Sequence, residues 1–326
     1  MIRFFADANY DFIGARKYAY GVTAVLFALS LVALIGLRLN YSIEFTGGTL
    51  VRVKSTQEVD VARLRSALET QGITGPEITT IGSSGGYLIR ARTAKAGSDA
   101  DNTQVTAAAV GAALDQAVGP GKYVIEGSGA VGPKVASELK GKALSAILLS
   151  FLAVLGYLAI RFEWRFGLAA VAATAHDIIL TIGFIALMRL EVSLVVVGAV
   201  LSMVGYSLND TIIIFDRVRE NLHKYKRDHF IDIINRSINE TLPRSVLTHG
   251  TTLTTLTSLA IFGGEVIRPF ALVMFFGVFT GTFSSIYIAG PVLIWVEQKW
   301  PGADARGVKP GARVAAPPAT REPVGA

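Results

Sequence analysis

Six stretches of the chain are apolar over a length that could cross a lipid bilayer. A membrane-spanning helix needs about 20 mostly apolar residues. Four of the stretches carry no Asp, Glu, Lys or Arg, and the other two carry one aspartate each, Asp177 and Asp210. The pattern therefore predicts six transmembrane helices, over residues 18–37, 143–160, 166–188, 192–215, 246–264 and 269–296.

The first stretch differs from a cleavable signal peptide. Its apolar part is too long, and Arg38-Leu39-Asn40 follows where a cleavage site would have small residues. We therefore expect a retained helix.

Between the first two stretches lie about a hundred residues with an ordinary share of polar side chains. Alternation and turn residues predict strands over 41–53, 77–81, 87–93 and 123–126, and helices over 56–72 and 103–118. The order β-α-β-β-α-β is typical of ferredoxin-like domains. The sequence thus predicts an α-helical polytopic membrane protein with an α+β ferredoxin-like periplasmic domain over residues 38–142.

Composition agrees with a membrane protein. Of the 326 residues, 51% are hydrophobic and only 17% are charged, which argues against a soluble domain and against disorder over most of the length. The chain has no cysteine, so disulfides, thiolate chemistry and iron–sulfur clusters are excluded.

The net charge of +6 is explained by topology rather than by binding to nucleic acid. Basic residues gather in 1–17, 216–245 and 297–326, whereas the short turns on the opposite side hold only Arg189 and Arg268. Because Lys and Arg are retained on the cytoplasmic side, we expect both termini in the cytoplasm. Residues 216–245 predict an amphipathic helix on the inner membrane surface, and 297–326 a disordered cytoplasmic tail.

Asp177 and Asp210 are the residues most indicative of function. An ionisable group inside a membrane is costly and usually belongs to an ion or proton pathway, although such residues can also serve only to hold helices together. Each aspartate accompanies a stripe of small and hydroxyl side chains at helical spacing, and the stripe of the fourth helix includes Asn209. The stripes predict a polar seam inside the helix bundle.

Several neighbouring residues have two readings. The hydroxyl groups of the fifth helix, from Thr248 to Ser258, could line the seam or bond back to their own helix. Arg244 could pair with a carboxylate on a neighbouring helix, or it could simply follow the positive-inside bias. His176 and Asp177 are adjacent, so their side chains should point about 100° apart on a helix and should not share one site. We expect no metal site.

The glycines Gly127, Gly129 and Gly132 match the dinucleotide fingerprint G-x-G-x-x-G. A transmembrane helix follows them instead of a βαβ unit, so we interpret them as a hinge between the outer domain and the membrane. Neither a Walker A motif nor a serine-hydrolase elbow is present. We therefore expect neither an enzyme nor a bound cofactor. The pair Gly277 and Gly281 forms a G-x-x-x-G that can allow close helix contact.

These features together resemble a known family. The motifs are Tyr41 to Gly48, Val131-Gly132-Pro133, His176-Asp177, Val204 to Thr211 running into Phe215 to Asn221, and Arg244 ahead of Thr251-Thr252-Leu253. Through them the chain resembles the SecF family, the smaller membrane subunits of the SecD–SecF accessory complex of the bacterial protein translocase. The membrane core of that family is similar to that of proton-driven RND exporters.

The resemblance implies a subunit in the bacterial inner membrane that uses the proton motive force to assist translocation and release of secreted proteins. By matched motif, Asp210 would be the proton-responsive carboxylate and Arg244 its basic partner, with Asn209 and Asp177 in the same pathway. The implied partners are SecD as a heterodimer, the SecYEG translocase, YajC and YidC, an unfolded secretory precursor and membrane lipid.

Three departures from the family pattern stand out. Glu44 replaces the usual Asp in the periplasmic motif that also contains Gly47 and Gly48, Asn40-Tyr41 replaces a Gly-rich lead-in, and His249 replaces a small hydroxyl residue. Two other functions remain open from the sequence: an RND-like exporter of small molecules or lipids, and a passive scaffold for SecD. The sequence also leaves open whether the coupling ion is a proton or sodium.

Overall fold

The computed structural model describes residues 5, 8–73, 76–81, 85–91 and 99–301. The chain divides into two compact units. One is helical and comprises residues 1–39, 149–190 and 195–326, while the other comprises residues 40–148 and 191–194. The predicted tail over 297–326 lies almost entirely outside the described residues.

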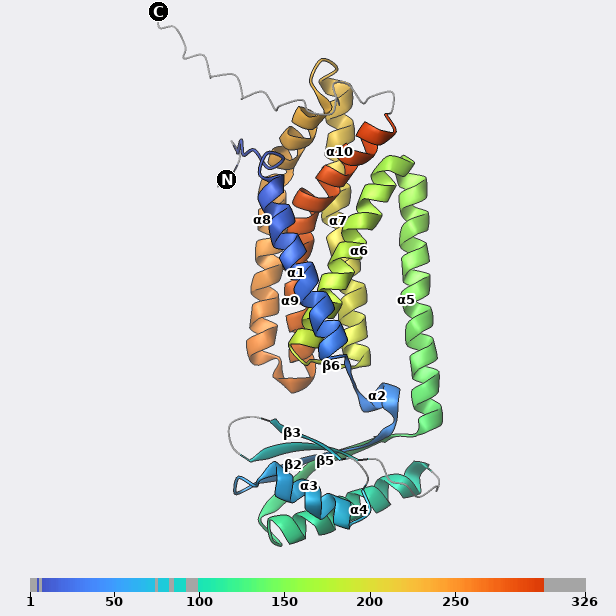
Figure 1. Ribbon diagram of the computed structural model, residues 1–326, viewed down its shortest axis with the longest axis vertical. Coiled ribbons are helices and arrows are strands. Elements are labelled where there is room, and N and C mark those ends of the chain that lie inside the picture. The colour runs from blue at the N-terminus through green and yellow to red at the C-terminus, as the bar shows by residue number, and fades with distance from the viewer. Residues whose placement is uncertain (1–4, 6–7, 74–75, 82–84, 92–98, 302–326) are drawn as a thin grey trace, which may run out of the picture. The chain divides into compact units, whose positions relative to one another are not determined.

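The helical unit is built from long apolar helices (Figure 1). They are α1 (Arg16–Gly36), the end of α5 (Pro133–Arg161), α6 (Trp164–Leu187), α7 (Leu194–Lys224), α8 (Phe230–Phe262), α9 (Gly264–Ser284) and α10 (Gly290–Lys299). A π-helical turn, η1 (Ser285–Ala289), joins α9 to α10. Helix α6 packs against α1 and α9, and α9 packs against α8.

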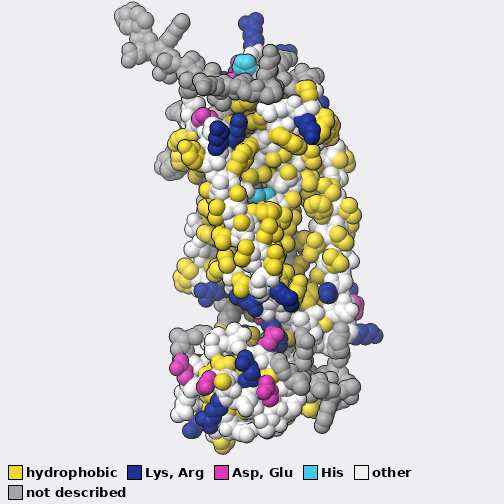
Figure 2. Space-filling model, viewed as in Figure 1, with side chains coloured by type: hydrophobic (Ala, Val, Ile, Leu, Met, Phe, Trp, Pro, Cys, Tyr) yellow, Lys and Arg dark blue, Asp and Glu magenta, His cyan; other side chains and the backbone are white. Residues whose placement is uncertain are grey.

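Apolar side chains cover the outer face of the helical unit, and Lys and Arg gather toward its ends (Figure 2). Large hydrophobic residues such as Val32 and Ile35 on α1 are exposed, as expected for helices that face lipid. Five helical segments are long and apolar enough to cross a membrane: Arg16–Gly36, Lys134–Arg161, Trp164–Leu187, Leu194–Lys224 and Val266–Lys299. The protein is therefore a multi-pass membrane protein.

The prediction of a separate amphipathic helix over 216–245 is wrong. Residues 216–224 continue α7, and residues 230–245 form the first half of α8, so that only a short turn separates the two helices. The predicted fifth span, 246–264, is the second half of α8, which is not among the five segments that meet the length and hydropathy requirements. Charged side chains beyond an apolar stretch do not end a helix when its backbone hydrogen bonds continue, so the charge pattern did not reveal where these helices end.

Glycines let α9 approach α7 closely, as the G-x-x-x-G pair suggested. A Cβ atom on Gly281 would lie 2.9 Å from the Cβ atom of Ser207, and one on Gly277 would overlap the Met203 side chain. No such crowding surrounds Gly205, which lies on the same α7 helix and whose Cβ would meet nothing within 4 Å. Close approach at Gly281 also keeps Ser207 in position for the buried site described below.

We expect Gly281→Val to destabilise the helical unit, whereas Gly205→Val should not. Overpacking a tight contact costs about 1–3 kcal/mol, and the valine would push Ser207 away from α9. Thermal unfolding of the two purified variants in detergent tests this expectation. Equal melting temperatures for both variants would contradict the close contact between α7 and α9.

The second unit contains a four-stranded antiparallel sheet. Its strands are β2 (Gly48–Ser55), β3 (Glu77–Ile81), β4 (Gly86–Ala91) and β5 (Tyr123–Val131), in the spatial order β3-β4-β2-β5. Helices α3 (Val61–Thr70) and α4 (Asp99–Ala117) pack together, and Leu64, Leu68 and Leu114 form a core with Val51 and Ile89 of the sheet. The predicted order of strands and helices matches the observed one.

The predicted strand over 41–53 is interrupted. Only Asn40–Tyr41 (β1) and Gly48–Ser55 (β2) are extended, and the short helix α2 (Ile43–Thr46) lies between them. Gly47 and Gly48 follow with backbone φ angles of 70° and 124°, which residues other than glycine rarely adopt. The two glycines thus allow the chain to turn from α2 into the sheet.

Candidate functional site

Both intramembrane aspartates are buried inside the helical unit. Asp177 of α6 is 0% exposed and Asp210 of α7 is 4% exposed. Burying a carboxylate is costly unless hydrogen bonds or opposite charges compensate it, so the partners of each aspartate indicate its role.

Asp177 is held by three neighbours from three parts of the chain. Its Oδ2 accepts hydrogen bonds of 2.6 Å from the hydroxyl groups of Ser207 on α7 and Ser284 on α9. Its Oδ1 lies 2.9 Å from Nδ1 of His176. The expectation that His176 and Asp177 could not share one site is wrong, because both side chains bend toward each other although their Cβ atoms point apart. Asp177 thus ties α6, α7 and α9 together.

The π-helical turn η1 begins directly after Ser284. Its first residue, Ser285, pairs with Thr211 of α7 through hydroxyl groups 2.9 Å apart. Single π-helical turns inside longer helices frequently occur at functional sites. Here the turn aims two successive serines at polar groups of other helices, Ser284 at Asp177 and Ser285 at Thr211.

Asp210 is far less restrained than Asp177. Its Oδ1 accepts a 2.6 Å hydrogen bond from the hydroxyl group of Ser245 on α8. Its Oδ2 is buried and has no hydrogen-bond partner among the described residues, and Nδ1 of the buried His249 on α8 has none there either. Asn209, the neighbour of Asp210 in sequence, is exposed. One oxygen of Asp210 is therefore available to a proton or a water molecule.

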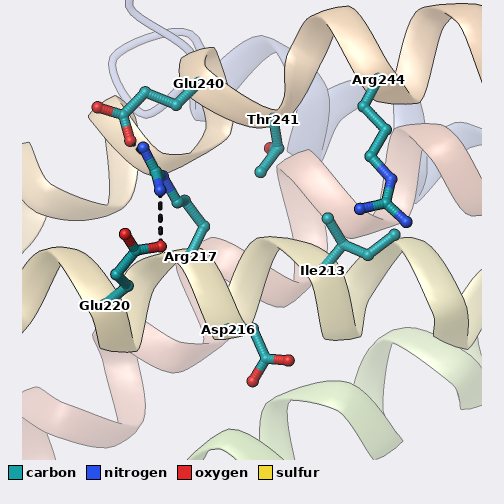
Figure 3. Close-up of a pocket in the computed structure, with 7 residues that line it drawn as sticks. All are labelled: Ile213, Asp216, Arg217, Glu220, Glu240, Thr241 and Arg244. Carbon is teal, nitrogen blue, oxygen red and sulfur yellow. Dashed lines mark hydrogen bonds and ion pairs between the residues drawn. The ribbon is translucent and has the colours of Figure 1, made fainter.

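Arg244 does not pair directly with Asp210 in the described part of the chain. It is exposed and lines a cleft of about 470 Å³ between α7 and α8, next in sequence to the Ser245 that binds Asp210. Figure 3 shows the Arg244 side chain reaching from α8 toward Ile213 of α7. The other lining residues are Asp216, Arg217, Glu220, Glu240 and Thr241.

At the other end of this cleft, Arg217 joins carboxylates of both helices. Its Nε lies 2.6 Å from Glu240 Oε2, and its Nη1 lies 2.6 Å from Glu220 Oε2. Asn221 Nδ2 donates a 2.7 Å hydrogen bond to the same Glu240 oxygen. Burial acts to raise the pKa of Glu240, but the hydrogen bonds from Asn221 and Arg217 outweigh it, so the pKa lies below its usual range.

We expect Glu240→Gln to lower the melting temperature at pH 7 and to have progressively less effect as the pH falls. Because the pKa is lower in the folded than in the unfolded state, the stabilisation is complete above the unfolded value of about 4.3 and is lost as the pH falls through the folded value. Melting of wild type and variant from pH 7 to pH 3 tests this. A melting difference that stayed constant over that range would contradict it.

Most of the threonine hydroxyl groups between residues 248 and 258 of α8 bond back to their own helix, which is the second of the two possibilities left open by the sequence. Thr251, Thr254, Thr255 and Thr257 are exposed, and each donates to the carbonyl four residues earlier in its own helix. Thr252 lies 2.7 Å from the Tyr206 hydroxyl group of α7. The four exposed threonines thus form an exposed face of α8 and do not line the buried site.

Two glycines of the predicted hinge lie in a strand. Gly127 and Gly129 belong to β5, where they pair with Arg52 and Leu50 of β2. Bending β5 at these two glycines would break ladder bonds to β2. Gly132 alone lies between β5 and α5.

Glu44, in the motif that also contains Gly47 and Gly48, contacts the beginning of α7. Glu44 Oε2 accepts a 2.6 Å hydrogen bond from the backbone N–H of Leu194, the first residue of α7. Gly47 and Gly48 turn the chain next to it. Sequence reasoning also missed Ser207, Ser245 and Ser284, since lone serines in apolar helices are common and their partners lie far away along the chain. Among the described residues, no three His, Asp or Glu side chains form a group able to hold a metal ion.

Comparison with known proteins gives consistent matches. The family "Protein export membrane protein SecD/SecF, C-terminal" matches residues 111–299, and the "SecD/SecF GG Motif" matches residues 32–59. A protein translocase subunit SecF of Gemmatimonas aurantiaca is 50% identical over 324 residues, covering 95% of each chain. One from Cereibacter sphaeroides is 40% identical over 304 residues, covering 92% of each chain.

The fold is similar to that of a solved protein. The crystal structure of SecDF, a translocon-associated membrane protein from Thermus thermophilus, matches with a TM-score of 0.77 and 34% identity over 90% of this chain. A second structure, of SecDF in a super-membrane-facing form, matches with a TM-score of 0.63. The chain spans 39% of the length of each of these SecDF chains.

Proposed function

The chain belongs to the SecF family of protein translocase subunits, and from this premise we propose that it uses the proton motive force to assist protein export through Asp210. Its accessory role in Sec export follows from the family. The proton-responsive role is supported by one observation above all: Asp210 is buried and yet has an oxygen without a hydrogen-bond partner in the described part of the chain.

The cleft between α7 and α8 supports a route to Asp210 from the inner side. Arg244 and Glu240 line it, and Ser245 connects its wall to Asp210 by a hydrogen bond. Protonation of Asp210 removes its charge and weakens that bond, so that α8 can shift against α7. Departure of the proton restores the bond. Asp177, with its three neighbours, keeps α6, α7 and α9 in register during the cycle.

We further propose six membrane crossings, with both termini in the cytoplasm of a bacterium and the protein in its inner membrane. The second half of α8 would be the sixth crossing, since its exposed residues include Val246, Leu247, Ile261 and Phe262. The sheet order β3-β4-β2-β5 with α3 and α4 supports a ferredoxin-like domain, which would face the periplasm.

SecD is the proposed partner in a heterodimer. The similarity to part of a chain that is named SecDF supports this. The exposed hydroxyl-rich face of α8, with Thr251 and Thr255, offers polar groups that a second helix bundle could cover. SecYEG, YajC, YidC, a secretory precursor and lipid are further expected contacts.

The test is export of a secreted precursor by pulse-chase in cells depleted of this protein, together with affinity purification of the tagged chain. Accumulated precursor and recovery of SecD with the SecY channel are expected. Normal export without SecD recovery would instead favour an independent RND-like exporter. Restoration of export by every assembled variant of Asp210 and Arg244 would leave only a scaffold role for SecD.

A further inference from the structure

The connection between α6 and α7 belongs to the second unit, residues 40–148 and 191–194, which we call the outer unit. Both helices themselves belong mainly to the helical unit. Residues 191–194 cluster with residues 40–148. In this connection, β6 (Glu191–Val192) pairs in parallel with β1, matching Asn40 with Glu191 and Tyr41 with Val192. The backbone N–H of Ser42 adds a 2.9 Å hydrogen bond to the Val192 carbonyl group. The outer unit thus holds a short piece of chain from between two membrane helices.

Arg90, at the end of β4, reinforces this pairing. Its Nη2 lies 2.6 Å from Glu191 Oε1, and its Nη1 donates to Glu77 Oε2 at 2.7 Å and to the Tyr41 carbonyl group at 3.2 Å. The Arg90 side chain is only 10% exposed. A guanidinium group that is largely shielded from water makes stronger and more directional bonds than an exposed one. Arg90 therefore fixes both strands of the β1–β6 pair to the main sheet.

Glu44 adds a second attachment at the beginning of α7. Its carboxylate accepts from the Leu194 N–H at 2.6 Å and is itself steadied by the Ser42 hydroxyl group at 3.3 Å. A negative charge at a helix N-terminus is favourable, because the first N–H groups have no partner within the helix and carry partial positive charge. The first turn of α7 contains no acidic residue of its own, so Glu44 supplies this charge from 150 residues away.

The end of α6 is restrained before the connection begins. Arg189 donates to the carbonyl groups of Leu37 and Arg38, where α1 ends. Arg189 and Arg38 adopt φ values of 54° and 55°, so the chain turns sharply at both points. The end of α6 is therefore fastened to the end of α1.

We propose that Arg90 and Glu44 are positioning residues that fasten the α6–α7 connection to the outer domain, so that movement of α7 and movement of that domain are coupled. The inference rests on the proposed function and replaces the glycine hinge as its mechanical link. Helix α7 is continuous from Leu194 to Asp210, a length of about 24 Å at 1.5 Å per residue. A shift of α7 at Asp210 therefore reaches its first turn, where Glu44 and Arg90 pass it to the sheet.

Arg90→Gln tests the proposal. Export is measured with the proton motive force intact and after an uncoupler has collapsed it, and the difference is the force-dependent part. We expect that part to fall about tenfold, the scale of a typical coupling between two sites, with normal membrane level and SecD recovery. Arg63→Gln is the matched control, since Arg63 is an exposed arginine on α3 of the same unit and its replacement should change nothing.

A disulfide separates coupling from simple stability. The chain has no cysteine, and Tyr41 and Val192 are register partners, about 4.8 Å apart across neighbouring strands, which a disulfide can bridge. In the Arg90→Gln background, oxidised Tyr41→Cys/Val192→Cys should restore force-dependent export, and reduction should lower it again to the level of Arg90→Gln alone. A defect that persisted with the disulfide formed would overturn the proposal, as would normal export by Arg90→Gln.

Asp210→Asn serves as the reference that separates this inference from the proposed function. Loss of force-dependent export in Asp210→Asn but not in Arg90→Gln overturns the coupling role alone. No loss in either variant overturns the proposed function, and the inference with it.

Discussion

Asp210→Asn is expected to abolish the force-dependent part of protein export while leaving the protein folded and assembled. The amide has nearly the same shape as the carboxyl group, and its oxygen can still accept the 2.6 Å hydrogen bond from Ser245. What it loses is the ability to bind and release a proton. Export should therefore fall to the rate seen after the proton motive force has been collapsed.

The measurement is pulse-chase export of a secreted precursor in cells whose only copy carries the substitution, with membrane level and SecD recovery followed in parallel. Asp228→Asn is the matched control, in the turn between α7 and α8 and outside the residues that line the cleft. Asp228 forms a partly exposed ion pair with Arg236, and exposed pairs contribute only about 0–1 kcal/mol, so this variant should export normally. Wild-type export by Asp210→Asn would remove the proton-responsive role of this residue.

The two aspartates could be identified from the sequence because an acidic residue within a membrane-spanning stretch is costly and usually functional. Their partners could not. Ser207, Ser245 and Ser284 come from three helices and reach the aspartates only after the helices have packed. A hydroxyl residue in an apolar helix can bond to its own backbone, as Thr251 and Thr254 do. Position along the chain does not distinguish these two uses.

The fold shows the same division between local and long-range information. The order of strands and helices in the outer unit was predictable, since alternation and turn residues are local signals. The capture of Glu191 and Leu194 by that unit was not, because it depends on Arg90 and Glu44, which lie at least 100 residues earlier. The pairing of Gly127 and Gly129 with β2 was not predictable for a related reason: the register with β2 is a property of the sheet and not of the glycine pattern.

We propose different roles for the two buried carboxylates because their surroundings differ. Asp177 uses both oxygens to hold side chains of α6, α7 and α9, whereas Asp210 uses only one. A group held by three neighbours loses much when it changes charge, and one held by a single neighbour loses little. We therefore place Asp177 in the pathway chiefly as an anchor and Asp210 as the group that cycles.

Asp177→Ala is accordingly expected to destabilise the protein far more than Asp210→Ala. The alanine leaves His176 and Ser207 without their partner in a buried site, and each unsatisfied group costs about 1–3 kcal/mol. Ser284 keeps its bond to the Gly281 carbonyl group but loses the one to Asp177, whereas Asp210→Ala removes the partner of Ser245 alone. Membrane level and thermal unfolding in detergent should both be reduced, with Asp177→Asn intermediate because its amide oxygen still accepts.

Removal of the two hydroxyl groups that donate to Asp177 gives the decisive comparison. Adding Ser207→Ala and Ser284→Ala to Asp177→Ala should recover part of the lost stability, because replacing both partners of a buried hydrogen bond is less costly than replacing one. The same two serine substitutions in the presence of Asp177 should be destabilising. Two results would contradict the anchoring role: additive losses of stability in the triple variant, or equal melting temperatures for Asp177→Ala and Asp210→Ala. Asp177 would then be as good a candidate as Asp210 for the group that binds and releases the proton.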